Sequence, residues 1–149
     1  MKLAEALQER ADLNRRIQQL NTRLLNNALV QEGEQPAEDP VSLLSEYDTT
    51  MDALEEITAK INLANCKTMV DGKSLTELIA RRDALTQRVK TCRELAQAAS
   101  QLYRRATRSE IKIFSAVDVK ELQKRADRLA KELRMLDNTI QQTNWTVDL

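Results

Sequence analysis

The chain has 149 residues, of which 31% are charged and 42% apolar, with two glycines, two prolines and no histidine. This length fits one domain, and so few turn-forming residues favour long helices over sheet. The lack of histidine excludes the usual zinc ligand and the Ser-His-Asp triad, and 23 basic residues balanced by 23 acidic ones exclude a net field that would concentrate nucleic acid or an anionic membrane around the protein.

The first predicted helix covers residues 2–27. Apolar residues recur along it at alternating steps of three and four, which is the heptad pattern of a helix that packs on another helix. The positions of this seam are Leu3, Ala6, Arg10, Leu13, Ile17, Leu20 and Leu24. We therefore expect one side of the helix to be buried and to carry a single arginine.

An acidic connector, residues 28–39, interrupts the helical pattern with Gly33 and Pro36. Asp39 can accept hydrogen bonds from the free amides of the next helix, and Pro40 suits the first helical position because it has no amide hydrogen. The carboxylates of the segment are Glu32, Glu34, Glu38 and Asp39. They could hold a calcium or magnesium ion, but their spacing is not that of an EF-hand loop. We interpret the segment as a solvated connector, and we expect neither a metal nor a cofactor.

The second predicted helix covers residues 40–65 and keeps the apolar pattern with one change of phase. A hairpin follows at about residues 67–74, in which Asp71 and Gly72 are a two-residue turn signal. Ser74 and Glu77 then form a capping box at the start of the third helix, residues 75–104.

Apolar residues in the second half of the third helix exceed what one partner helix can cover. Residues 109–115 alternate polar and apolar side chains and predict a short strand with an exposed edge. The residues of this predicted interface are Leu95, Ala98, Leu102, Ile111, Ile113 and Phe114. Because contiguous exposed apolar residues usually mark an interface, we expect a homo-oligomer. Asp118 is placed to cap the fourth helix, residues 119–142.

Arginine and aspartate recur close together in three of the helices, as Arg10 with Asp12, as Arg82 with Asp83 and as Arg125 with Asp127. Such groups could form a polar layer that binds an anion or a partner. The interpretation we favour is structural: the arginine stems lie in the seam and the heads pair with these carboxylates inside the bundle, which fixes the register of the helices.

The two cysteines, Cys66 and Cys92, do not form a CxxC motif, and Cys92 falls on the seam of the third helix. We expect two reduced thiols, as in a reducing compartment. Charged residues at Glu5, Glu9 and Arg10 interrupt the N-terminal segment, so it lacks the apolar core of a signal peptide. These features predict a cytoplasmic protein.

Four segments of the chain carry a resemblance to a known family. They are NNALVQEGEQPAEDP at 26–40, ARRDALTQRV at 80–89, RSEIKIFSAVDVKELQK at 108–124 and NWTVDL at 144–149. In their order and spacing the chain resembles, over essentially its whole length, a family of small uncharacterised bacterial proteins labelled septicolysin. The resemblance implies a helical fold and assigns no catalytic residues, and its label implies a membrane-permeabilising toxin.

The sequence thus predicts a mainly α protein: one domain, residues 1–149, in which four long helices form an antiparallel bundle with coiled-coil-like seams and a minor short β element. We expect no enzymatic activity. The predicted function is that of a cytoplasmic oligomeric scaffold or interaction module, without a nucleic-acid or membrane partner. The alternative is a membrane-active septicolysin-like cytolysin, and a carboxylate-metal enzyme has the least support from the residues.

Overall fold

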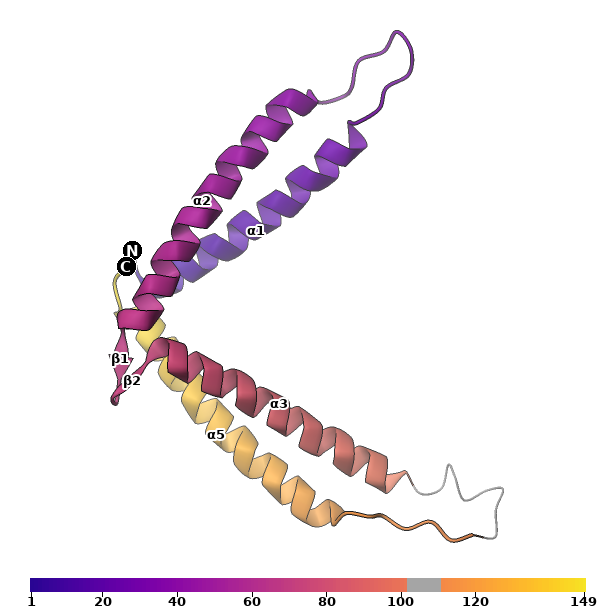
Figure 1. Ribbon diagram of the computed structural model, residues 1–149, viewed down its shortest axis with the longest axis vertical. Coiled ribbons are helices and arrows are strands. Elements are labelled where there is room, and N and C mark those ends of the chain that lie inside the picture. The colour runs from indigo at the N-terminus through magenta and orange to yellow at the C-terminus, as the bar shows by residue number, and fades with distance from the viewer. Residues whose placement is uncertain (102–110) are drawn as a thin grey trace. The chain divides into compact units, whose positions relative to one another are not determined.

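The computed structural model describes residues 1–101 and 111–149. This part of the chain forms four helices and two short strands (Figure 1). In chain order they are α1 (Leu3–Asn26), α2 (Pro40–Lys67), β1 (Met69–Val70), β2 (Lys73–Ser74), α3 (Leu75–Ser100) and α5 (Val119–Thr146). The prediction of a mainly helical protein with a small β element is confirmed, and each helix begins within one residue of its predicted start.

The contacts of the chain fall into two compact units. Unit 1 comprises Met1–Met69 and Thr143–Leu149, and unit 2 comprises Val70–Gln142. The sequence led us to expect a single folding unit. The boundary falls between Met69 and Val70 in the short hairpin that follows α2, because α1 packs along α2 in one unit and α3 along α5 in the other (Figure 1).

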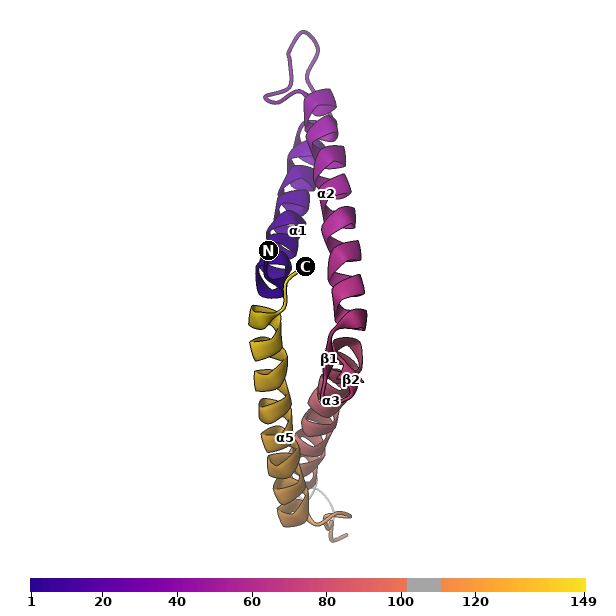
Figure 2. The same ribbon diagram turned by 90° about the vertical axis from the view of Figure 1, so that its left-hand side faces the viewer.

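Unit 1 is a helical hairpin in which α1 and α2 lie side by side and antiparallel, joined by the acidic connector (Figure 2). Its core is a single stripe of apolar side chains between the two helices. The buried apolar residues of these helices are Leu3, Ala4, Ala6, Leu20, Leu43, Ile57 and Ile61. Asp39 caps α2 as predicted, because its carboxylate accepts hydrogen bonds from the amides of Val41 and Ser42, both at 3.2 Å.

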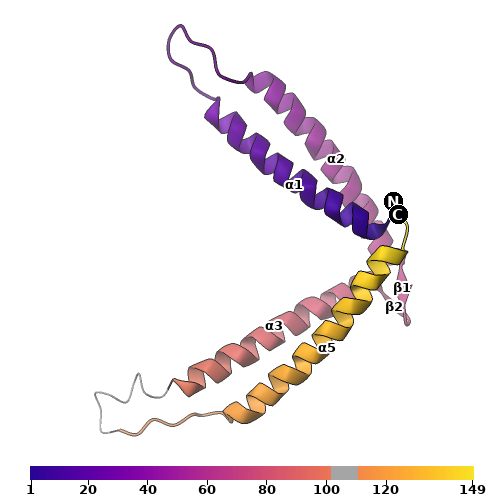
Figure 3. The same ribbon diagram turned by 180° about the vertical axis from the view of Figure 1, so that it is seen from behind.

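The two ends of the chain are joined within unit 1, as the N and C labels of Figure 3 show. Lys2 and Asp148 form an isolated antiparallel β-bridge. The Leu3 amide donates to the Val147 carbonyl at 2.9 Å, the Leu149 amide donates to the Met1 carbonyl at 3.0 Å, and the Lys2 ammonium lies 2.9 Å from the Asp148 carboxylate. The start of α1 is therefore held by the residues that follow α5.

Unit 2 combines the small sheet with α3 and the first part of α5, which lie side by side and antiparallel (Figures 1 and 3). Strands β1 and β2 pair with each other across a turn in which Asp71 and Gly72 have φ of 51° and 81°. Positive φ at both central residues is the hairpin geometry that an Asp-Gly pair favours. The buried apolar residues of the helices in this unit are Leu75, Leu78, Leu85, Val89, Cys92, Ala96, Ala126, Ala130 and Ile140.

The strand predicted at 109–115 is not found. Residues 111–115 have irregular backbone, residues 109 and 110 lie outside the described part of the chain, and the sheet in the described part contains β1 and β2 alone. Alternating polar and apolar side chains favour an extended segment, but a strand also needs a neighbour that completes its hydrogen bonds. In addition, α5 runs to Thr146, one turn beyond its predicted end.

Candidate functional site

Besides the Lys2–Asp148 pair, two ion pairs of the described residues connect different segments within unit 1. Arg16 on α1 lies 2.8 Å from the Glu46 carboxylate on α2. The Arg23 side chain, near the end of α1, donates from Nε to Glu38 of the connector at 3.0 Å, and the Glu38 amide donates to the Asn27 side chain at 3.0 Å. The hydrogen bond from Arg23 holds the pKa of the Glu38 carboxyl below its usual value. Glu38 is therefore part of the folded hairpin, which the prediction of a solvated connector missed.

The polar layer predicted from Arg10, Asp12, Arg82 and Asp83 is not buried. Asp12 pairs with Arg15 one turn later, and both side chains are exposed. Arg82 does pair with Asp83, at 3.0 Å, but 66% of the Asp83 side chain is exposed. Arg10 is half-buried and makes no ion pair within residues 1–101 and 111–149. The heptad pattern identified the seam correctly, but a two-helix hairpin is thin enough for long arginine side chains to reach water.

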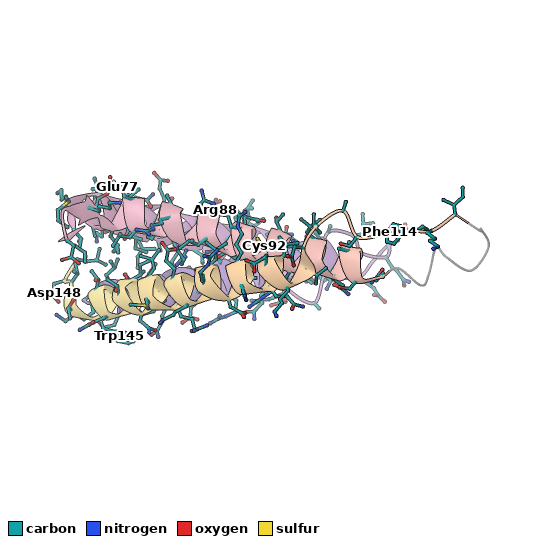
Figure 4. All side chains as sticks on the ribbon, turned by 90° about the horizontal axis from the view of Figure 1, so that it is seen from below. Glu77, Arg88, Cys92, Phe114, Trp145 and Asp148 are labelled. Carbon is teal, nitrogen blue, oxygen red and sulfur yellow. The ribbon has the colours of Figure 1, made fainter. Side chains whose placement is uncertain are left out.

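Five of the six residues of the predicted interface lie in the described part of the chain, and Leu102 lies outside it. Ala98 is exposed, and the exposed fractions of the other four side chains are 43% for Leu95, 76% for Ile111, 38% for Ile113 and 78% for Phe114. Leu95 lies on the last turns of α3. Phe114 lies on the segment that leads into α5 (Figure 4).

A hollow of about 310 Å³ lies between α3 and α5 in unit 2, and we call it the arginine hollow. Arg88 and Leu95 of α3 and Leu122 and Arg125 of α5 line it together with Gln87, Thr91 and Cys92. Figure 4 shows Arg88 and Cys92 one turn apart on α3. No acidic side chain lines the hollow, and neither arginine makes an ion pair with another residue of the described chain. The hollow thus offers two uncompensated positive charges beside apolar surface.

Charge is divided unequally between the two units. Unit 1 contains 7 Lys and Arg against 13 Asp and Glu, a net charge of −6, and unit 2 contains 16 against 10, a net charge of +6. The total over the whole chain is zero, which hides this division. Counting charge by segment would have found this division from the sequence alone, because residues 70–142 form one continuous basic stretch of the chain.

The chain has no histidine, a residue that hydrolytic and metal-dependent enzymes often use. Within the described residues, no three Asp, Glu or Cys side chains are grouped closely enough to hold a metal ion. Each carboxylate with a lowered pKa accepts a structural hydrogen bond. Glu38 pairs with Arg23, Asp39 caps α2, Glu56 pairs with Lys60, Glu77 completes the capping box of α3 and Asp148 pairs with Lys2.

Comparison with known proteins points to proteins of unknown function. A family model described as a family of unknown function, DUF6847, matches residues 10–149. The crystal structure of a functionally unknown conserved protein from Corynebacterium diphtheriae is 39% identical to this chain, and the match covers 100% of this chain and 98% of that one with a TM-score of 0.95. No curated protein matches the chain.

These findings contradict the resemblance to septicolysin-labelled proteins, because neither the family nor the similar structure points to septicolysin. The segments that suggested the resemblance are instead compatible with membership of a family without an assigned activity. None of the helices in residues 1–101 and 111–149 has the long, weakly charged apolar run that a membrane span requires.

Proposed function

The chain belongs to DUF6847, a family of unknown function, and we propose that it is a non-enzymatic helical scaffold or interaction module that assembles into a homo-oligomer. The observation that carries this proposal is the exposure of Leu95, Ile111 and Phe114 in unit 2. Burying large apolar side chains against a second surface lowers the free energy, because it removes them from water.

The thin core of the helical hairpins supports the same proposal. Two helices bury only the stripe where they face each other, so each helix keeps most of its circumference in water. Packing hairpins from separate copies against each other would give each helix a second neighbour. In the proposed assembly, the helices form antiparallel bundles with coiled-coil-like seams.

Light scattering on the purified full chain tests the proposal. At micromolar concentration we expect a mass that is a multiple of 17.0 kDa, and replacing Leu95 and Phe114 together with glutamate should reduce it to that of one chain. Met135→Glu is the matched control, because Met135 is an exposed apolar residue of α5 outside the proposed interface. A wild-type mass of one chain would refute the assembly.

We further propose a cytoplasmic location and a protein partner, with no role for nucleic acid or a membrane. Cys66 is exposed and Cys92 is buried, and exposed thiols stay reduced in a reducing compartment. The whole chain has a net charge of zero and therefore no overall attraction to phosphate-rich surfaces, although unit 2 alone carries +6. Fractionation of cells that express the tagged chain tests the location, and recovery in the medium or the envelope would contradict it.

A further inference from the structure

The outer face of α2 in unit 1 carries acidic and apolar side chains together. Val41, Leu44 and Met51 expose 76%, 51% and 37% of their surface. Asp48 lies four residues after Leu44, and Glu55 lies seven residues after Asp48, so both are on the same face as these residues. This face lies opposite the stripe of α2 that is buried against α1, which contains Leu43, Ile57 and Ile61.

The carboxylates of this acidic α2 face have no cationic partner in the described part of the chain. Glu46 is paired with Arg16 and Glu56 with Lys60. Asp48, Asp52 and Glu55, by contrast, make no ion pair with any residue that the structure describes. Between Pro40 and Ala59 the helix contains no lysine or arginine at all. The face therefore presents uncompensated negative charge beside exposed apolar surface.

The arginine hollow of unit 2 has the complementary character. Arg88 and Arg125 are uncompensated positive charges, and Leu95 and Leu122 provide apolar surface beside them. Arginine suits such a site because its planar head can bind a carboxylate with two parallel hydrogen bonds. The units also differ in net charge, −6 for unit 1 and +6 for unit 2, so unit 1 of one copy attracts unit 2 of another copy at long range.

We propose that the arginine hollow is a docking site for the acidic α2 face of a second copy of this chain. The inference rests on the proposed function, because it names the second surface of the homo-oligomer. Each copy carries both surfaces, so the contact joins two different surfaces, and two copies that dock reciprocally form a closed dimer. Carboxylates of the α2 face bind the guanidinium groups, while Leu44 and Met51 cover Leu95 and Leu122.

Charge reversal on each surface separately tests the docking. One variant carries Arg88→Glu and Arg125→Glu, and a second carries Asp48→Lys and Glu55→Lys. Each variant alone faces like charges across the contact, so its self-dissociation constant in sedimentation should rise by tenfold or more. A mixture of the two variants in equal amounts restores opposite charges in every contact, and it should associate as the wild type does.

Two control variants test whether association depends on charges at the contact itself or only on the net charge of each unit. Lys120→Glu with Lys131→Glu changes unit 2 by the same charge outside the hollow, and Glu32→Lys with Glu34→Lys does so for unit 1 in the connector. All four residues are exposed, and both controls should keep the wild-type mass. A titration of the wild type with salt needs no substitution: association should weaken from 0.1 M to 1 M, since the screening length falls from about 10 Å to about 3 Å.

The outcomes distinguish this inference from the proposed function. A wild type that remains a single chain would overturn both. An oligomer that dissociates when Leu95 and Phe114 are replaced with glutamate, but is unaffected by the charge reversals and by salt, would overturn the docking alone. Charge-reversed variants that fail to associate when mixed would also overturn it, provided circular dichroism shows that both retain their helices.

Discussion

The glutamates of the acidic connector are the same residue type, but the structure gives them different roles. Glu38 is bound by Arg23, whereas Glu32 and Glu34 are exposed and make no ion pair within residues 1–101 and 111–149. The hydrogen bond from Arg23 stabilises the charged form of Glu38 and lowers its pKa below the usual 4.5. Glu38 is therefore the connector glutamate expected to affect the stability of unit 1.

The first prediction concerns the pH dependence of this pair. A carboxyl with a lowered pKa in the folded state contributes stability above its unfolded pKa, and it loses that contribution as the pH falls through the folded pKa. Glu38→Gln should therefore lower the melting temperature at pH 7, and the difference from the wild type should shrink as the pH falls below about 4.5. Calorimetry between pH 7 and pH 3 measures it. The double replacement of Glu32 and Glu34 with glutamine is the control, and a Glu38→Gln effect of equal size at both ends of the range would contradict the assignment.

The second prediction concerns Ile61, whose side chain is fully buried between α1 and α2. Ile61→Ala removes three carbon atoms from a core that is only one stripe wide, and it should lower the free energy of unfolding by about 3 kcal/mol. Denaturation by urea measures the loss. Leu63→Ala, two residues along the same helix at an exposed position, should cost less than about 1 kcal/mol, and similar losses for both would show that this stripe is not the core.

At the scale of elements, the helix starts depend on short local motifs. Ser74 caps α3 by accepting a hydrogen bond from the Glu77 amide at 3.2 Å, while the Glu77 carboxylate accepts one from the Ser74 amide at 2.7 Å. Ser74 is also the last residue of β2, so the cap sets where the hairpin passes into the helix. A local motif of this kind is readable from sequence because all its partners lie within four residues.

The third prediction follows from this cap. Ser74→Ala leaves the Glu77 amide without its acceptor and should lower the free energy of unfolding by about 1 kcal/mol. Amide exchange should show the loss first at the start of α3. Ser45→Ala is the control, since Ser45 is an exposed residue in the interior of α2 and alanine is the better helix former there. Equal effects of the two substitutions would argue against the capping box.

At the scale of the whole molecule, a neutral chain is composed of two oppositely charged units, and its two ends are held together in unit 1. Residues 147–149 lie more than 140 positions from Met1–Leu3, and the backbone bonds between them close the chain into a loop. Contacts of such long sequence separation hold the first turn of α1 in place only while unit 1 is folded.

The fourth prediction concerns this junction of the ends. Deleting residues 147–149 removes the acceptor of the Leu3 amide, so exchange of that amide with solvent should become at least about tenfold faster. The Leu85 amide, on α3 in unit 2, should exchange at the wild-type rate. Nuclear magnetic resonance measures both. An unchanged rate at Leu3 would show that the β-bridge does not protect the start of α1.

The sequence by itself determined the elements: where the helices start, the Asp71-Gly72 hairpin, the caps at Asp39 and Ser74, and which face of each helix carries the core. These features depend on backbone preferences and on partners a few residues away, so a single chain segment contains all the information. The division of charge between residues 70–142 and the rest was equally readable, although a count over the whole chain hides it.

Only the tertiary structure decided which side chains meet across long separations. The chain forms two units, Arg23 pairs with Glu38, and Lys2 pairs with Asp148. The side chains of Asp12 and Asp83 are exposed to water. The residues that line the arginine hollow come from two helices, and they include Arg88, Leu95, Leu122 and Arg125. A periodic pattern indicates that one face of a helix is apolar. It does not indicate how many neighbouring helices cover that face or which of their residues lie opposite it. Those depend on how the helices pack, and packing is a property of pairs of segments that no single segment encodes.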